Sequence, residues 1–236
     1  TELAKISLHM CLSPSIGVAN TLAELCENIG AAWPEIVPAL KLDRRIGPYS
    51  YLAAGLGIAG GNLERDLATV ERLALEHGTD AQIIRAFVDN SRHRRDWAAR
   101  TIHSALLDAK PNAIVAVWGL AYKENTRSVK NSPSLATIAQ LHSARLQLHD
   151  PLVPLSEARH PAARACADPL EAVRGAEALM ILTPWPQYRQ IAPADIARSM
   201  HGRIVLDPYA VLDLNAAEAA GLRYYTLGRP APVDTA

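Results

Sequence analysis

Residues 110–119 of the 236-residue sequence read Lys-Pro-Asn-Ala-Ile-Val-Ala-Val-Trp-Gly, and the apolar pattern of the chain changes at this point. Before Pro111, apolar residues recur at helical spacing over long stretches. After it, short and almost continuously apolar runs alternate with helical stretches. Such runs are typical of parallel strands covered by helices on both faces. We therefore predict an α/β protein, with a helical segment over residues 1–108 and a Rossmann-like parallel sheet over residues 109–236.

The predicted sheet has five or six strands. Five apolar runs are candidate strands: Ala113–Val117, Leu146–Leu148, Ala178–Leu182, Ile204–Leu206 and Arg223–Thr226. Four stretches between them are predicted helices: Ser134–Ser143, Pro169–Arg174, Pro186–Ile191 and Asn215–Ala220. Ligands of parallel sheets bind at the carboxyl ends of the strands. The loops that begin at Gly119, His149, Thr183 and Asp207 are therefore candidate ligand contacts.

The first half of the chain is predicted to hold four helices. The first covers residues 3–28, with a kink or restart at Pro14 and a stop at Gly30. The others are Trp33–Leu40, Leu63–Glu76 with Asn62 as N-cap, and a long helix from Asp80 to about Asp108. The first helix has more apolar surface than one small domain needs, including Ile16, Val18 and Ile29, so we expect a homodimer.

Composition excludes several classes of partner. The chain has 24 Lys and Arg against 24 Asp and Glu, so no overall charge attracts nucleic acid or an anionic membrane. Its apolar runs are too short to span a bilayer. Three cysteines without CxxC spacing favour a reducing compartment, and we expect a cytoplasmic protein without a metal site. From the start at Thr1, already in a helical pattern, we expect an artificial or proteolytic start or a missing beginning; a complete protein trimmed of a tag is the alternative.

Two segments carry candidate chemistry. A glycine-rich loop, residues 55–61, leads into a helix at Asn62, where backbone N–H groups and the helix dipole favour an anion such as a diphosphate. Residues 119–126 follow a predicted buried strand and contain Lys123, whose ammonium could reach a phosphate or a sugar oxygen. Taken alone, a glycine-rich loop of this kind is more often a tight turn than a phosphate site, and the lysine is as often a solvated side chain as a ligand contact.

Together these segments resemble the UDP-glucose/GDP-mannose dehydrogenase family. Residues 5–31 resemble its central dimerisation helix, residues 42–48 its loop near the active site, and residues 119–123 the entry to its C-terminal domain. Later segments follow in the expected order: Ser132-Pro133, His149-Asp150-Pro151, Leu182-Thr183-Pro184-Trp185 and Val205-Leu206-Asp207. The resemblance extends to about residue 229.

The resemblance implies the substrate-binding and dimerisation portion of an NAD-dependent nucleotide-sugar 6-dehydrogenase of polysaccharide biosynthesis. In the family, an N-terminal Rossmann domain binds NAD, the central helix pairs two subunits, and the C-terminal domain holds the UDP-sugar. A cysteine captures the aldehyde intermediate, which leads to a thioester and then to the uronic acid. NAD would be bound mainly by a domain absent from this chain, so the isolated chain is expected to be inactive.

The sequence departs from the family at the nucleophile, because Asn62 stands at the position of the catalytic cysteine. The resemblance implies catalytic roles for Asn62 and Asp66, and Arg65 stands where a lysine is usual. It implies substrate contacts for Arg45, Tyr51, Gly57, Gly60, Gly61, Tyr122 and Lys123. It also implies that Arg45 reaches the substrate of the other subunit and that Lys130 reaches NAD.

Three further residues, His9, Trp97 and Trp118, are interpreted as packing or surface residues. Asn62 has two interpretations, as a polar group that orients the substrate or simply as a helix N-cap. For the protein, the alternative to an active dehydrogenase is a catalytically inactive homologue that binds a nucleotide sugar or regulates a partner. A purely structural protein is a third reading.

Overall fold

The computed structural model describes residues 2–232. Contacts divide the chain into two compact units, one formed by the chain up to Arg95 with Gly228–Pro230 and the other by Asp96–Leu227. The division therefore falls earlier than residue 108. Helix α5 (Trp97–Ile102) belongs to the second unit because it packs on α6 and β5.

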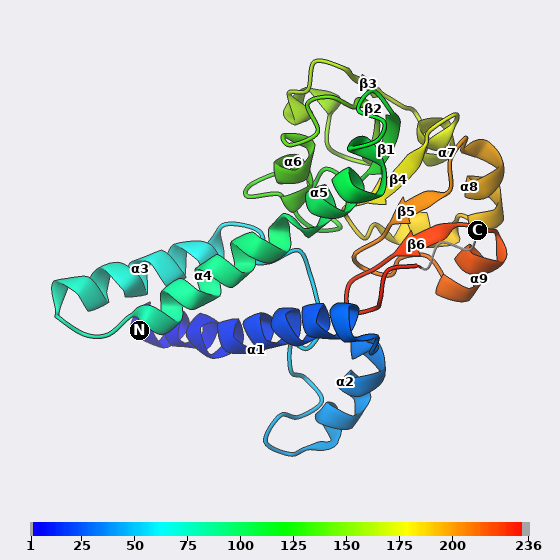
Figure 1. The fold of residues 1–236 in the computed structure, drawn as a ribbon. Helices are drawn as coiled ribbons and strands as arrows, with labels where there is room; N and C mark the ends of the chain where they lie inside the picture. Colours follow the sequence, from blue (N-terminus) through cyan, green and yellow to red (C-terminus); the bar gives the residue numbers. More distant parts are fainter. Residues whose placement is uncertain (1, 233–236) are drawn as a thin grey trace. The chain divides into compact units, whose positions relative to one another are not determined.

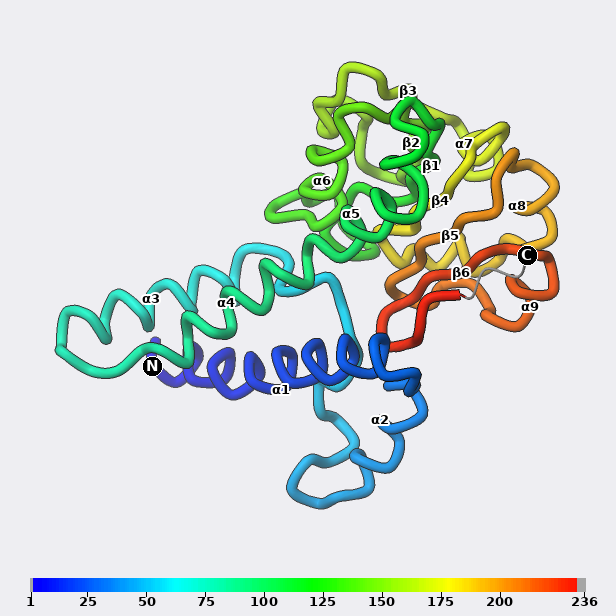
Figure 2. The backbone as a smooth tube through the Cα atoms, in the orientation of Figure 1, coloured from blue at the N-terminus to red at the C-terminus, as the bar shows by residue number. Residues whose placement is uncertain are grey.

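The first unit is a set of helices in which α1 (Glu2–Ile29) lies alongside α3 (Asn62–Glu76) and α4 (Gln82–Arg95) (Figures 1 and 2). Helix α2 (Trp33–Leu42) follows Gly30, which stops α1 with a φ of 81°. Two apolar clusters hold the unit together. One contains Ala19, Ala23, Cys26, Trp33 and Leu52, and the other Ile58, Leu67 and Ile84.

Helix α1 runs through Pro14 without a break, so the predicted restart there is wrong. Proline removes one helical hydrogen bond. On either side of the proline, Met10 and Ile16 pack against the apolar cluster of Ile58, Leu67 and Ile84. Packing before and after Pro14 therefore stabilises a continuous helix.

The predicted helix from Asp80 to Asp108 is also corrected, because it consists of three pieces. Helix α4 ends at Arg95, α5 follows, and a π-helical turn, η1 (His103–Leu107), ends the run. The pieces bury different faces. Arg94 of α4 is fully buried and pairs with Glu27 of α1, whereas α5 buries Trp97 and Ile102 in the second unit.

The second unit is built on a six-stranded parallel sheet with the order β3-β2-β1-β4-β5-β6. The strands are β1 (Ile114–Trp118), β2 (Arg145–His149), β3 (Ala163–Ala165), β4 (Ala178–Ile181), β5 (Ile204–Leu206) and β6 (Arg223–Tyr225). The predicted Rossmann-like sheet is confirmed, with β1 in its interior. Sequence reasoning missed β3, because this edge strand is short and not apolar.

Helices cover both faces of this sheet (Figure 1), with α5 and α6 on one face and α7, α8 and α9 on the other. Their bounds are α6 (Pro133–Ile138), α7 (Pro169–Val173), α8 (Pro193–Ser199) and α9 (Leu214–Ala219), with 3₁₀ turns η2 (Leu155–Ala158) and η3 (Pro186–Gln190). Residues 186–191 were predicted as a helix and form mainly η3, while α8 was missed.

Gly119 gives the first prediction from the fold. It follows β1 with a φ of 94°, and a Cβ at this position would overlap the side chain of Thr183. Gly119→Ala should therefore cost about 3 kcal/mol in the free energy of unfolding, from left-handed strain and overpacking together. Gly175→Ala is the matched control, since Gly175 has a φ of 70° but faces open space, and it should cost only about 1 kcal/mol. Equal losses in urea unfolding would contradict the close approach.

Candidate functional site

The glycine-rich loop of the first unit, residues 55–61, is anchored to two helices. The Gly55 N–H donates to Asn20 Oδ1 of α1 at 2.9 Å, and the Ile58 N–H donates to Ser91 Oγ of α4 at 2.7 Å. Gly57 has a φ of 71°, and a Cβ there would overlap the backbone carbonyl of Ser91. A glycine is therefore required at position 57 by packing on α4, independently of any ligand.

The end of this loop leads directly into α3. Gly60 is buried with a φ of 77°, and Gly61 occupies the N-cap position without a side-chain hydrogen bond. Asn62 is the first residue of the helix and is exposed. The interpretation of Asn62 as the N-cap is therefore wrong, because Gly61 takes that place. The amide of Asn62 is directed to solvent at the helix N-terminus, where the helix dipole is positive.

One turn further along α3, Asp66 pairs with a histidine from another helix. The distance between Asp66 Oδ2 and His9 Nδ1 of α1 is 2.6 Å. The side chain of Asp66 is 5% exposed and that of His9 is 23% exposed. The two residues lie 57 positions apart in the sequence, so no local pattern indicates the pair. The sequence-based interpretation of His9 as a packing or surface residue did not include this contact with a predicted site residue.

The second oxygen of Asp66 is also engaged. Arg65 donates to Oδ1 from both Nε and Nη2, each at 3.1 Å. Burial disfavours the charged carboxylate, but the hydrogen bonds from His9 and Arg65 outweigh it, and the pKa of Asp66 lies below its ordinary value. Asp66 is therefore an ionised and fully hydrogen-bonded carboxylate, which suits an orienting role.

Arg45 lies in the loop that follows α2. Its side chain is 89% exposed and holds Asp43 through two hydrogen bonds, Nε to Oδ1 at 3.0 Å and Nη2 to Oδ2 at 2.6 Å. The hydrogen bond from Arg45 lowers the pKa of Asp43 below its ordinary value. Arg45 also borders a groove of about 390 Å³, together with Trp33 and Leu52. Tyr51, close by in sequence, is exposed.

The second unit has its own polar centre at the carboxyl end of β1. The N–H groups of Leu120 and Ala121 donate to Asp150 Oδ2 at 2.6 and 3.2 Å, and the Trp185 indole N–H donates to the same oxygen at 3.2 Å. Backbone donors at this strand end bind phosphate in dinucleotide-binding sheets. Here the chain's own carboxylate occupies them.

The loop after this strand end carries the predicted Tyr122, Lys123 and Lys130. The Lys123 ammonium lies 5.7 Å from the centre of the Tyr122 ring, and the backbone N–H of Tyr122 donates to the Ser128 carbonyl at 3.1 Å. Lys123 and Lys130 are both exposed. The loop therefore offers an aromatic ring and a cation together, while Lys130 lies further along it. Trp97 and Trp118 are buried, as a packing role requires.

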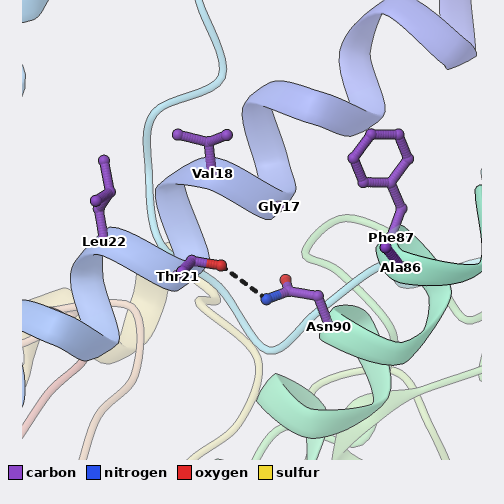
Figure 3. A pocket seen from close by; sticks show the side chains of 7 residues that line it. All are labelled: Gly17, Val18, Thr21, Leu22, Ala86, Phe87 and Asn90. Atoms are coloured by element: carbon purple, nitrogen blue, oxygen red, sulfur yellow. Dashed lines mark hydrogen bonds between the residues drawn. The ribbon is translucent and has the colours of Figure 1, made fainter. Parts of the chain in front are cut away.

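An apolar groove of about 390 Å³ runs between α1 and α4 (Figure 3). Its walls include Val18 and Leu22 of α1 and Phe87 of α4, and one hydrogen bond crosses it, from Asn90 Nδ2 to Thr21 Oγ1 at 2.9 Å. The exposed large apolar side chains of α1 are Leu3, Leu8, Val18, Leu22, Leu25 and Ile29. Among residues 2–232, no helix has the length and apolar character needed to cross a membrane.

Two family models match the chain. The central domain of the UDP-glucose/GDP-mannose dehydrogenase family matches residues 1–92, and the UDP binding domain of the same family matches residues 116–214. The two matches follow each other in order and fall within the first and second compact units.

Known proteins resemble the chain along almost its whole length. A UDP-glucose 6-dehydrogenase of Pseudomonas aeruginosa is 30% identical over 97% of this chain and 52% of its own length. The Bacillus subtilis UDP-glucose 6-dehydrogenase TuaD is 27% identical over 98% of this chain and 50% of its own. This chain thus spans about half the length of the curated relatives it matches.

Solved structures show the same correspondence. A UDP-glucose dehydrogenase from Pyrobaculum islandicum superposes with a TM-score of 0.81 and 26% identity, covering 98% of this chain and 51% of its own. A UDP-D-ManNAc dehydrogenase from Pyrococcus horikoshii superposes with a TM-score of 0.80 and 25% identity, covering 97% of this chain and 51% of its own.

The lowered pKa of Asp66 predicts acid sensitivity. A carboxyl whose pKa is depressed on folding stabilises the protein above its unfolded pKa of about 3.9, and this stability is lost as pH falls through the folded value. Asp66→Asn should therefore cost about 2 kcal/mol at pH 7, the scale of hydrogen bonds to a charged group, and less at pH 3. Urea unfolding at both pH values measures this. Asp89→Asn is the control, because Asp89 is exposed and pairs with Arg92. A loss of stability for Asp66→Asn that does not depend on pH would contradict the ionised pair.

Proposed function

Because the chain belongs to the UDP-glucose/GDP-mannose dehydrogenase family, we propose that it is the dimerisation and substrate-binding portion of an NAD-dependent nucleotide-sugar 6-dehydrogenase. The observation that carries the proposal is the match of two successive family domains, in order, to the chain's two compact units. In this proposal, each unit supplies one part of the chemistry. The second unit recognises the nucleotide, and the first unit handles the reacting end of the sugar.

Nucleotide recognition is assigned to Tyr122 and Lys123. Because Asp150 already occupies the backbone donors at the end of β1, recognition of a diphosphate by this loop depends on side chains. The Lys123 ammonium is exposed beside the Tyr122 ring, so it is available as a point charge for a phosphate oxygen, and the ring as an apolar surface.

At the sugar end, the start of α3 supplies polar groups. Gly60 and Gly61 lead the backbone to the helix N-terminus, and Asn62 presents an exposed amide there. Arg45 is proposed to reach the substrate bound by a second subunit, and Tyr51 to contact the nucleotide. For Arg45 this requires exchange of its Asp43 partner for a ligand oxygen. The exchange is inexpensive, because an exposed ion pair contributes little stability.

NAD, which accepts hydride in dehydrogenases of this kind, does not fit the second unit in the usual way. In doubly wound sheets the pyrophosphate binds where the first strand meets the following helix. In this chain Asp150 accepts the backbone N–H groups at that position. We propose that NAD is bound mainly outside these residues, with Lys130 as the contact from this chain. The chain alone is therefore not expected to turn over.

Asn62 changes the expected reaction. An amide nitrogen is delocalised into its carbonyl and is a poor nucleophile, so it does not form the covalent adduct that a thiolate forms. Asn62 can instead hydrogen-bond a hydroxyl, a carbonyl or a hydrated aldehyde. We propose oxidation without a covalent intermediate. The alternative is a catalytically inactive homologue that binds a nucleotide sugar or regulates a partner.

The binding proposal is tested with UDP-glucose by calorimetry. Lys123→Gln should weaken binding about tenfold or more, since a hydrogen bond to a charged group contributes about 1.5 to 3 kcal/mol. Lys130→Gln is the matched control: it removes the same charge from the same loop and should leave UDP-glucose affinity within about twofold. Equal losses in the two variants would mean that general charge, and not Lys123 itself, attracts the nucleotide.

A homodimer through residues 3–28 is the proposed assembly. Six large apolar side chains of α1 are exposed, and two of them, Val18 and Leu22, also line the groove between α1 and α4. Exposed apolar surface of this extent is typical of protein contact sites. A second copy of α1 is the occupant that the family predicts, and this assembly would also bring Arg45 to the other subunit.

The dimer gives a further prediction. A double substitution, Val18→Glu with Leu22→Glu, places two charges in the groove and should convert the dimer to a monomer at micromolar concentration. Burial of unpaired charge in an interface costs several kcal/mol. Leu75→Glu, at an exposed apolar residue of α3, is the control and should stay dimeric. Light scattering that gives a monomer for the unaltered chain would refute the assembly.

A further inference from the structure

We propose that His9 is the proton acceptor at the sugar end of the site, and that Asp66 is the positioning residue that holds it. This inference rests on the proposed function and deepens it, since it names the group that takes a proton from a substrate hydroxyl or from a hydrating water. The observation that carries it is the hydrogen bond between the partly exposed His9 imidazole and the buried Asp66 carboxylate. Asp66 lies one helical turn after the exposed Asn62 on α3.

The two ring nitrogens of His9 have different partners. Nδ1 lies 2.6 Å from Asp66 Oδ2, and because an ionised carboxylate only accepts, Nδ1 is the donor. In the neutral ring this leaves the Nε2 lone pair as an acceptor. Nε2 has no hydrogen bond to any residue between 2 and 232 in the structure, and the side chain is 23% exposed. Nε2, the nitrogen that can accept a proton, is therefore also the one that can contact a ligand.

Asp66 itself is poorly placed to be the proton acceptor. Its side chain is 5% exposed, one oxygen accepts from His9 and the other accepts twice from Arg65. Each hydrogen bond favours the ionised form, so the carboxylate is a weak base. What Asp66 can do is hold one tautomer of His9 and stabilise the imidazolium that forms, as a carboxylate does for a general-base histidine.

The proton balance is simple. A hydroxyl or water O–H bond breaks, its proton forms a bond with Nε2, and the electron pair stays on the oxygen. The ring becomes imidazolium, and its charge is balanced by the Asp66 carboxylate. Asn62 can hold the same oxygen through its amide N–H, but it cannot take the proton. The other charged groups on the adjoining faces are Arg65 on α3 and Lys5, one turn before His9 on α1.

A competing explanation is that His9 and Asp66 only tie α1 to α3. The substitution His9→Gln distinguishes the two explanations, because a glutamine amide can still donate a hydrogen bond to Asp66 but cannot accept a proton. The matched control is His93→Gln in the same unit. His93 of α4 pairs with Glu24 of α1 at 2.7 Å, away from Asn62 in sequence, and has no role in the proposed site.

The first test uses long-range ¹H–¹⁵N NMR of the chain, which needs no turnover. In its neutral form the His9 ring should carry its proton on Nδ1 and not on Nε2, and UDP-glucose should shift the His9 Nε2 resonance but not that of His93. In Asp66→Asn the tautomer preference should weaken. If UDP-glucose binds and His9 does not respond, or if Nε2 carries the proton, the assignment is overturned and the proposed function stands. If UDP-glucose does not bind at all, the proposed function fails, and this inference with it.

The second test follows UDP-glucose-dependent NAD reduction in the full-length protein. His9→Gln should lower kcat about 100-fold or more, the usual contribution of a general base, with KM nearly unchanged. His93→Gln should behave as the unaltered protein. A kcat for His9→Gln within a few-fold of the original would assign the pair a structural role only.

Discussion

A carboxylate that is ionised inside a protein needs partners, and Asp66 obtains them from two helices. Burial alone would favour the neutral acid. His9 and Arg65 reverse that balance with three hydrogen bonds, and the pKa of Asp66 falls below its ordinary value. Because one partner lies on α1, the pair connects the first helix of the unit to α3. The position of the α3 N-terminus, and of the exposed Asn62 there, depends on this connection.

The second unit uses a carboxylate for a related purpose. Asp150 satisfies two backbone N–H groups at the end of β1 and an indole N–H from the loop after β4. In a dinucleotide-binding sheet those backbone groups are left for phosphate. Because Asp150 accepts these hydrogen bonds, the proposed recognition of the nucleotide falls to side chains further along the loop. A Rossmann-like topology therefore does not by itself identify a dinucleotide site.

The amide at position 62, where the family resemblance implies a thiol, has a consequence for the proposed site. In a reaction without a covalent intermediate, the substrate must be held by hydrogen bonds while protons move, so orientation and proton acceptance carry more of the reaction. In the proposed reaction, Asp66 and His9 supply both at one helix end. The glycine loop before it is also fixed, by Asn20 and Ser91, which limits the freedom of the backbone that leads to Asn62.

The sequence by itself determined the class of fold and most elements of the sheet. Short, continuously apolar runs such as Ile204–Leu206 require burial on both faces of a sheet. This requirement can be recognised from the residues of the run alone. The glycine-rich loop before α3 was also readable, because its glycines are close together in the sequence, but the N-cap proved to be Gly61 and not Asn62. The tertiary structure decided the rest. The short edge strand β3 is stabilised by its neighbour and not by its own composition. Pro14 stays within α1 because packing on both sides outweighs one lost hydrogen bond. His9 meets Asp66 across 57 residues, and such a contact depends on how two helices pack, which no local pattern encodes.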